Sequence, residues 1–193
     1  MTRTSWDMAT LPGLVGWIES ALVEAVRPGP NPWRTPVLAT IGQGGPEART
    51  VVLRGVTLPG FELIAFSDAR AAKVSELTSD PRATWVFYDP AARVQLRVRT
   101  RVRVHTRDPV SQTYWHRLPG GQRGRYGHGA GPGTPLTDPA SGPGPEEAGD
   151  EAQFTVLVGA TLELDWLWLG DERHRRARFL RAGREWSGEW IQP

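Results

Sequence analysis

The 193-residue sequence contains no cysteine and only one lysine. The absence of cysteine excludes disulfides, thiolate metal sites and cysteine nucleophiles. The single lysine, Lys73, stands beside 22 arginines, an imbalance that is typical of an arginine-favouring genome. Because a protein surface accepts either residue, composition alone does not explain why the one lysine lies at this position.

The sequence also lacks long hydrophobic runs and a strong excess of charge. Its longest unbroken apolar runs have four residues, as at 63–66 and 85–88, too short to span a membrane. No apolar signal-peptide core follows Met1, so we expect a cytoplasmic protein. A net charge of +2 is weak for a nucleic-acid binder. Hydrophobic residues make up 39% of the chain, with nine tryptophans, which suffices for a folded core. We expect a single domain over 1–193.

Local patterns predict a mixture of short strands and a few helices. Apolar residues at helical spacing predict a helix over 12–27, which Pro28-Gly29-Pro30 ends. Strands over 37–41 and 49–56 are joined by a glycine-rich loop at 42–46, which indicates a hairpin. This loop lacks the third glycine of a dinucleotide-binding fingerprint and leads into a strand, so a Rossmann fold is disfavoured.

The strictest alternation in the sequence lies at 93–105, with valine and leucine on one face and arginine on the other. Asp68 is expected to cap a helix that ends near Leu77, and Asp108-Pro109 to start a helix that ends near Leu118. The remaining predicted strands are 61–66, 83–88, 154–168, 178–180 and 185–191. Twelve of the 23 residues at 127–149 are glycine or proline, which predicts a flexible loop.

These elements favour a mainly β fold with peripheral helices. At least six strands are joined mostly by short connections, three helices are interspersed, and no βαβ alternation persists. A closed or partly closed antiparallel barrel fits this order best, with Greek-key-like connections.

Several catalytic and metal-binding patterns are missing. No serine has the G-x-S-x-G context of a hydrolase nucleophile. The four histidines are scattered singly without an H-x-x-x-H pair, so no metal site is predicted. The one acidic cluster, Glu146-Glu147, falls in the predicted flexible loop, where solvated charges are expected.

The basic residues carry more information. Ser67, Arg70 and Lys73 place hydroxyl, guanidinium and ammonium groups at a strand end and a helix start, an arrangement that suits a phosphate. The competing interpretation is ordinary helix capping with solvated charges. Arg49 and Arg54 are five residues apart, so a regular strand sends them to opposite faces and one pocket requires a bend.

The arginine face of 97–103 has two interpretations as well. One is a nucleic-acid-binding strand that contacts phosphates. The other is a strand face in solvent or at a subunit interface, paired to carboxylates elsewhere. No aromatic residues interleave with these arginines to stack on bases, so the structural interpretation is favoured.

Five sequence segments occur together in a specific order. Leu38-Ala39-Thr40 precedes Ala48-Arg49-Thr50-Val51-Val52-Leu53-Arg54, and Phe66 to Lys73 and Arg93-Val94-Gln95-Leu96-Arg97 follow. Trp168, Glu172, Arg178 and Phe179 complete the set. In this order and spacing the chain resembles the pyridoxamine 5′-phosphate oxidase-like flavoproteins, in particular their "related, FMN-binding" branch. The resemblance covers about 33–126 and 154–193.

The resemblance implies an FMN-binding split β-barrel and a homodimer with FMN at the subunit interface. In the family, the lysine that Lys73 resembles grips the FMN phosphate, and the glutamine that Gln95 resembles reaches the flavin ring. The residues like Trp168 and Arg178 reach FMN in the partner subunit. The cofactor-binding residues implied in this way are Arg49, Thr50, Val51, Val52, Leu53, Arg54, Phe66, Ser67, Arg70, Lys73, Gln95, Trp168 and Arg178.

On the substrate side the resemblance is incomplete. The candidates are Arg54, Tyr114, His174 and Arg176, with the last two exchanged in type relative to the vitamin B6 oxidases. Leu118 and Gln122 stand where those enzymes have a phosphate-binding arginine and serine. We therefore expect an FMN-dependent oxidoreductase that transfers hydride between flavin N5 and an unidentified small molecule, with dioxygen or a nicotinamide as the other redox partner. The alternatives are a true pyridoxamine 5′-phosphate oxidase, a non-catalytic FMN carrier and a basic nucleic-acid-binding module.

Overall fold

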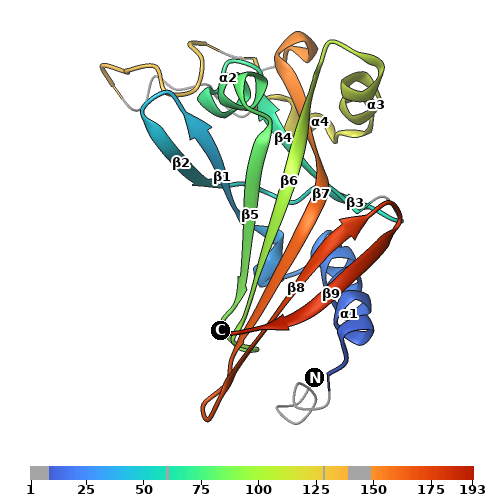
Figure 1. The fold of residues 1–193 in the computed structure, drawn as a ribbon. Helices are drawn as coiled ribbons and strands as arrows, with labels where there is room; N and C mark the ends of the chain where they lie inside the picture. Colours follow the sequence, from blue (N-terminus) through green and yellow to red (C-terminus); the bar gives the residue numbers. More distant parts are fainter. Residues whose placement is uncertain (1–8, 60, 128, 139–148) are drawn as a thin grey trace.

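The computed structural model of the chain describes residues 9–59, 61–127, 129–138 and 149–193. They form one antiparallel nine-stranded sheet with peripheral helices, which confirms the predicted mainly β fold (Figure 1). The helices are α1 (Leu11–Ala25), α2 (Ala72–Ser79), α3 (Pro109–Arg117), α4 (Gly120–Arg123) and the 3-10 turns η2 (Pro32–Arg34) and η4 (Glu151–Gln153). The strands are β1 (Val37–Gly42), β2 (Gly45–Thr50), β3 (Gly55–Thr57), β4 (Glu62–Asp68), β5 (Arg82–Asp89), β6 (Val94–Thr106), β7 (Phe154–Leu169), β8 (His174–Ala182) and β9 (Glu185–Ile191).

The segment at 51–54 closes the sheet into a barrel. The strand order runs β2-β1-β5-β6-β7-β4-β3. Beyond β2, the amide of Val51 donates to Pro36 O (2.9 Å) and that of Leu53 to Arg34 O (2.8 Å). The next amide, that of Arg54, donates to Ile64 O on β4 (2.7 Å). The chain thus crosses from the β1 side to the β4 side.

This crossing corrects the prediction of one continuous strand over 49–56. β2 ends at Thr50 and β3 begins at Gly55, because the backbone between them exchanges one hydrogen-bonding partner for another. The predicted hairpin is confirmed, since Gly42 pairs with Gly45 and only two residues form the turn.

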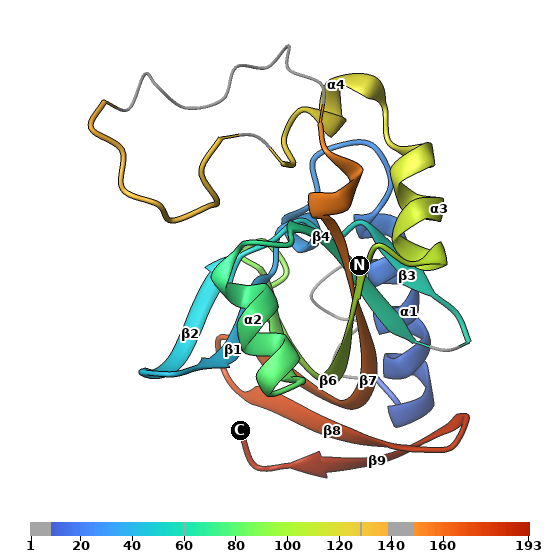
Figure 2. The ribbon, with the colours of Figure 1, turned by 90° about the horizontal axis from the view of Figure 1, so that it is seen from above.

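The two halves of the long strand β7 pair with different strands. β6 pairs with β7 along one side, from Thr155 to Trp168 of β7. The register of this pairing shifts between Arg99 and Thr100 of β6. On the other side, β4 pairs with its first half and β8 with its second half. Both views place α2 and α3 on opposite sides of the β6–β7 pair, at the β4 end (Figure 2). The β8–β9 hairpin lies toward the other end of β7. β4 and β8 therefore pair with separate parts of the same strand.

The main core fills the barrel and extends under α1. Trp85, Phe87, Trp166 and Phe179 are fully buried, and the indole N–H of Trp85 donates to Thr100 Oγ1 (3.1 Å). A second, smaller core lies beneath α3, around Trp115, Tyr126 and Phe154 and their neighbours. Burial of these aromatic side chains is the main term that fixes the sheet against its helices.

Helix boundaries match two of the three predictions. α1 occupies most of 12–27, and α3 begins at Pro109 after an Asp108–Ser111 capping box. Asp68, in contrast, is the last residue of β4 and not a helix cap, because its carboxylate accepts hydrogen bonds from Arg70 instead. α2 starts at Ala72, after an N-cap at Ala71 that has no side-chain hydrogen bond.

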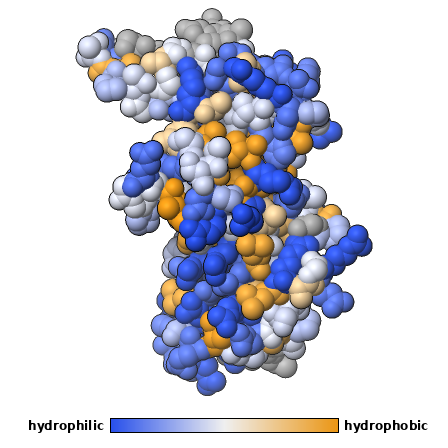
Figure 3. Space-filling model, turned by 45° about the horizontal axis from the view of Figure 1, so that its top comes forward, coloured by the Kyte–Doolittle hydropathy of each residue, from blue (hydrophilic) through white to orange (hydrophobic). Residues whose placement is uncertain are grey.

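The predicted alternation of β6 is confirmed, and three of its arginines pair with carboxylates. Arg97 contacts Asp165 (3.4 Å) and Arg99 contacts Glu163 (2.9 Å) on the neighbouring strand. Arg103 contacts Glu62 (2.7 Å). The structural interpretation of this face therefore has direct support. In the view of Figure 3, hydrophilic surface predominates and apolar surface is broken into smaller patches.

The glycine- and proline-rich stretch is only partly described. Its predicted flexibility, the Glu146-Glu147 pair and His128 lie wholly or partly outside the described residues. The ends of the stretch are joined where the amide of Asp150 donates to Tyr126 O (3.0 Å). Among the helices in the described part of the chain, none has the length and apolarity needed to cross a membrane.

Candidate functional site

The half-buried ammonium of Lys73 is the centre of the candidate site. Its Nζ donates to the buried hydroxyl of Ser67 (3.3 Å) at the end of β4. Among the described residues, no carboxylate forms an ion pair with it. Burial lowers the pKa of Lys73 and the nearby charge of Arg49 lowers it further, whereas Glu76 and Asp68 oppose this shift. A partly desolvated cation without a paired anion is a binding place for an anionic ligand.

The first turn of α2 adds backbone donors to the same place. Lys73 is the second residue of this eight-residue helix, and no side chain caps its N-terminus. The first amides of a helix lack intrahelical acceptors and carry the positive end of the helix dipole. Together with the ammonium and the Ser67 hydroxyl, they fit the oxygens of a phosphate monoester.

Arg49 approaches from β2 but is partly engaged. Its Nη2 donates to Glu76 Oε2 on α2 (2.8 Å), and its Nη1 donates to Thr40 Oγ1 on β1. The side chain is 23% exposed. Arg49 is close enough to Lys73 to perturb its pKa, so the two cations border one region between the β1–β2 hairpin and α2.

Arg70 has a different role from the one expected of a phosphate ligand. Its guanidinium donates to both carboxylate oxygens of Asp68 (2.9 and 2.8 Å) and to Gly129 O (2.8 Å). Asp68 also accepts from the amide of Gly127 (3.0 Å). Burial acts to raise the pKa of Asp68, but the hydrogen bonds from Arg70 and Gly127 outweigh it and lower the pKa. The Asp68–Arg70 pair therefore holds the start of the glycine-rich stretch.

Arg54, after the crossing, lies among aromatic side chains. Its guanidinium stacks over the ring of Phe66 with 5.6 Å to the ring centre, and Tyr114 contacts that ring at 5.4 Å. Burial raises the pKa of Tyr126, and the charge of Arg54 opposes this rise. No carboxylate of the described residues pairs with Arg54, so it is a second half-buried cation without a paired anion.

The remaining predicted site residues lie on β6, β7 and β8. Gln95 pairs with Leu167 on the outer face of the sheet. On the same face, Arg176 forms a two-point contact with Asp165 (2.9 and 2.7 Å), and Arg178 contacts Glu189 (2.6 Å). His174, at the start of β8, is exposed. Trp168 belongs to the main core and is 7% exposed. Because side chains alternate along a strand, Trp168 points away from the face that carries Gln95.

These residues form two groups that one chain does not bring together. Phe66 pairs with Val156 of β7, whereas Arg176 pairs with Leu167. These two positions are 11 residues apart along β7, which corresponds to roughly 36 Å of strand at about 3.3 Å per residue. Figure 1 shows the same separation, with α2 and α3 at one end and the start of β8 at the other.

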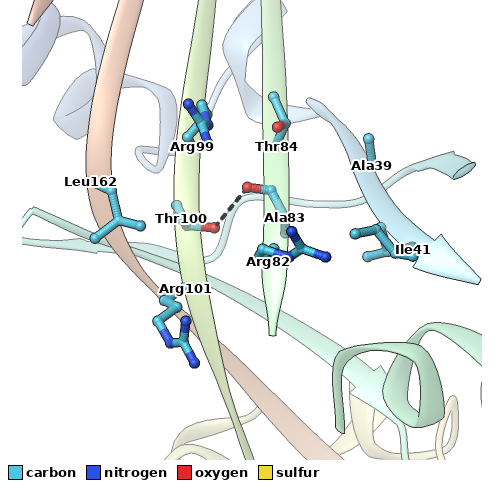
Figure 4. Close-up of a pocket in the computed structure, with 10 residues that line it drawn as sticks. Ala39, Ile41, Arg82, Ala83, Thr84, Arg99, Thr100, Arg101 and Leu162 are labelled. Carbon is cyan, nitrogen blue, oxygen red and sulfur yellow. Dashed lines mark hydrogen bonds between the residues drawn. The ribbon is translucent and has the colours of Figure 1, made fainter. Parts of the chain in front are cut away.

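Neither of two surface depressions coincides with the cations. A depression of about 580 Å³ lies between the β1–β2 hairpin and α2 and includes Glu76 in its lining. Another of about 350 Å³ lies on the outer face, where arginines of β5 and β6 meet Ile41 and Leu162 (Figure 4). Within the described residues, no group of three or more acidic or histidine side chains could hold a metal ion.

Comparison with known proteins identifies the family. Residues 17–106 match the model of the pyridoxamine 5′-phosphate oxidase FMN-binding domain. The match contains the crossing, the Ser67–Lys73 segment and Gln95. Over these residues the chain is similar to the pyridoxamine 5′-phosphate oxidase-like FMN-binding family. Its cofactor is FMN, a phosphate monoester, which agrees with the half-buried Lys73 and the uncapped helix start.

Curated relatives share part of the chain. A pyridoxine/pyridoxamine 5′-phosphate oxidase of Paraburkholderia phytofirmans is 36% identical over 108 residues, which are 55% of this chain and 47% of the relative. A protein of the same description from Azorhizobium caulinodans is 39% identical over 79 residues, 40% of this chain and 36% of the relative. The matches thus span less than half of these relatives' own lengths.

Solved structures match over almost the whole chain. A pyridoxamine 5′-phosphate oxidase-related, FMN binding protein from Nostoc punctiforme is 28% identical, with a TM-score of 0.75, and the match covers 96% of this chain and all of the other. PhzG from Burkholderia lata, solved with tetrahydrophenazine-1-carboxylic acid, has a TM-score of 0.70 at 19% identity over 100% and 98% of the two chains. The predicted split-barrel fold is confirmed.

Sequence reasoning missed three residues of this region. Glu76 and Thr40 hold Arg49, and Tyr126 lies near Arg54. A signal existed for Glu76, because it follows Lys73 by three residues and therefore lies on the same helix face. Thr40 and Tyr126 carried no such signal, since their contacts depend on strand pairing and on the second core.

The Asp68–Arg70 pair generates a prediction about the glycine-rich stretch. In Arg70→Ala, Asp68 loses its guanidinium partner and Gly129 O loses its donor. We expect hydrogen exchange at the Gly127 amide to accelerate by about tenfold or more, because local opening becomes easier. Amide exchange followed by mass spectrometry measures this.

Arg82→Ala is the matched control, because Arg82 makes the same set of contacts to Asp80 at the other end of α2. That variant should leave exchange at Gly127 unchanged. Equal exchange at Gly127 in wild type and Arg70→Ala contradicts the assigned role.

Proposed function

We propose that the chain is an FMN-dependent oxidoreductase that acts on a small molecule. The single observation that carries the proposal is the half-buried ammonium of Lys73, which has the Ser67 hydroxyl but, among the residues that the structure describes, no carboxylate as partner. When bound, FMN supplies a flavin N5 that exchanges hydride with a substrate, and the protein positions the reacting groups.

The proposed phosphate ligands are Lys73, Ser67 and Arg49, together with the first amides of α2. Lys73 supplies the charge, Ser67 fixes its position, and Arg49 offers planar donors. Arg70 contributes indirectly, because its guanidinium donates hydrogen bonds to Asp68 and to Gly129 O of the glycine-rich stretch. The crossing residues Thr50, Val51, Val52, Leu53 and Arg54 and the ring of Phe66 are the proposed wall for the flavin.

We further propose a homodimer in which each FMN contacts both subunits. Gln95, Arg176 and Arg178 lie at the far end of β7 from Lys73, and a second copy supplies them at the same site. Gln95 is the proposed hydrogen-bonding partner of the flavin ring, and Arg178 is the proposed contact from the partner. Trp168 is buried in the core behind this face, so in this proposal it supports the contact without making it. The two-point contact of Arg176 with Asp165 orients a cation on the face that this second copy would cover.

The proposed substrate is not pyridoxamine 5′-phosphate. Arg54 and Tyr114 flank Phe66 and can receive an anionic or hydrogen-bonding group. Leu118, however, is buried in the second core and offers no donor, and Gln122 presents a longer amide where those enzymes have a serine hydroxyl. A phosphate is bound by several charge-assisted hydrogen bonds, and this pocket lacks two of the groups that the vitamin B6 oxidases use.

The second candidate is a true pyridoxamine 5′-phosphate oxidase, which the names of the curated relatives favour. A nucleic-acid-binding role has less support, because the arginines of β6 are paired with carboxylates. A non-catalytic FMN carrier would share the phosphate site and differ only in lacking a reducible substrate.

The phosphate site predicts the behaviour of two variants. Wild-type protein should purify or reconstitute with a flavin absorption spectrum, and Lys73→Ala should bind FMN roughly 10- to 100-fold more weakly, because a charged hydrogen bond to phosphate is lost. Arg49→Ala should weaken FMN binding as well. Fluorescence titration of FMN gives the dissociation constants.

Arg27→Ala is the control, since Arg27 is an exposed cation that follows the end of α1 and pairs with Glu24. It should bind FMN as the wild type does. A colourless wild-type protein that added FMN does not reconstitute overturns the proposed function.

The shared site predicts complementation between two defective subunits. Lys73→Ala and Arg178→Ala each remove a contact from opposite halves of the site, so each homodimer is defective. In a mixed dimer one site carries both substitutions and the other carries neither. Coexpression should restore FMN retention at about a quarter of all sites, because half of the dimers are mixed.

Retention is measured as flavin absorbance per protein, and the mixed species is isolated with two different affinity tags. A mixed dimer that retains no more FMN than either variant alone refutes a site shared between subunits.

The substrate pocket predicts a slow reaction with pyridoxamine 5′-phosphate. FMN-loaded protein should release peroxide from this compound at least about 100-fold more slowly than the Paraburkholderia phytofirmans relative, because two phosphate contacts are missing. A coupled peroxidase assay under air measures both rates. Comparable rates in the two proteins would establish the second candidate.

A further inference from the structure

Glu76 joins the two sides of the proposed phosphate site. It lies on α2 with a side chain that is only 11% exposed. Its Oε2 accepts from Thr40 Oγ1 on β1 (2.5 Å) and from Arg49 Nη2 on β2 (2.8 Å). Thr40 is itself buried and contacts Nη1 of the same guanidinium. One carboxylate and one hydroxyl therefore hold the two terminal nitrogens of Arg49.

This arrangement fixes Arg49 without using all of its donors. A guanidinium carries five N–H groups. Thr40, Glu76 and, at 3.5 Å, Leu38 O account for three of them within the described residues. The Nε–H and one N–H of Nη2 remain for a ligand. A planar fork that is already oriented loses less conformational entropy when it binds phosphate oxygens.

The same carboxylate acts on Lys73. Lys73 precedes Glu76 by three residues, so the two side chains share one face of α2. The groups that act on the ammonium are Arg49 from β2, Asp68 from β4 and Glu76 from its own helix. Glu76 and Asp68 raise the pKa of Lys73, whereas burial and Arg49 lower it.

We propose that Glu76 is a positioning residue for the FMN phosphate, which orients Arg49 toward the ligand while it counterbalances the repulsion between Arg49 and Lys73. This inference rests on the proposed function. The plainer alternative is that Glu76 only ties α2 to the β1–β2 hairpin. The two roles predict different effects of removing Glu76. Loss of a purely structural link between α2 and the hairpin affects folding, whereas loss of a positioning residue affects the recognition of phosphate in particular.

The test compares FMN with riboflavin, which has the same ring system but no phosphate. In Glu76→Ala the dissociation constant of FMN should rise by about tenfold, because Arg49 loses its charged partner. The dissociation constant of riboflavin should stay within about twofold of the wild-type value. Glu47→Ala is the matched control, because Glu47 is an exposed carboxylate of the same hairpin and is not among the hydrogen-bonding partners of Arg49 in the described residues. It should leave both constants unchanged.

Two further readouts distinguish a positioning role from a structural one. In an Arg49→Ala background, Glu76→Ala should cause at most a small additional loss of FMN affinity, because the residue acts mainly through Arg49. The alkaline limit of FMN binding should also move to lower pH in Glu76→Ala, because removal of this carboxylate lowers the pKa of Lys73 further. Thr40→Val supplies the same comparison if Glu76→Ala fails to fold, since it removes the other partner of Arg49.

Equal losses for FMN and riboflavin overturn the inference, as do an unchanged or increased affinity for FMN and a full effect in the Arg49→Ala background. The proposed function fails separately. It fails if the wild-type protein does not prefer FMN to riboflavin, whereas a wild-type preference that is undiminished in Glu76→Ala refutes only the role of Glu76.

Discussion

The backbone crossing at 51–54 is the constraint on which the rest of the site depends. In two residues the chain leaves the β1 side of the sheet and joins β4, which closes the barrel. Arg49, before the crossing, points toward α2, and Arg54, after it, points toward Phe66. A regular strand sends residues five apart to opposite faces. The crossing uses that separation to border two neighbouring regions, one facing the helix start and one facing the second core.

The cations of the protein differ in whether a carboxylate pairs with them. Arg97 and Arg99 of β6 and Arg178 of β8 meet carboxylates across the sheet, and such exposed pairs contribute little to stability. Lys73 and Arg54 differ, because both are half-buried and neither pairs with a carboxylate of the described residues. Fixing an unpaired cation away from water opposes folding unless a ligand compensates. We propose that FMN, by binding there, relieves this local destabilisation.

Much of the fold could be predicted from local pattern, and the parts that could not depend on distant partners. The alternation of β6 and the Asp108-Pro109 helix start were evident, because strand period and capping are local properties. The order of motifs indicated the family. The break at 51–54 was not predictable, because it arises from an exchange of hydrogen-bonding partners. Asp68 and Arg70 pair with each other in preference to capping or binding phosphate, a competition that residue types alone do not decide. The inward direction of Trp168 follows from the register of β7, which no local motif specifies.

The single lysine allows the central claim to be tested directly. Selective isotopic labelling of lysine yields one side-chain signal, that of Lys73, and its titration followed by nuclear magnetic resonance reports one pKa. The account predicts a pKa below the ordinary lysine value in the FMN-free protein, because the ammonium is half-buried. Binding of FMN should raise that pKa, since a phosphate dianion stabilises the charged form, and riboflavin should leave it unchanged. A lysine signal that titrates identically with FMN, with riboflavin and without either would contradict the assignment of Lys73 to the phosphate.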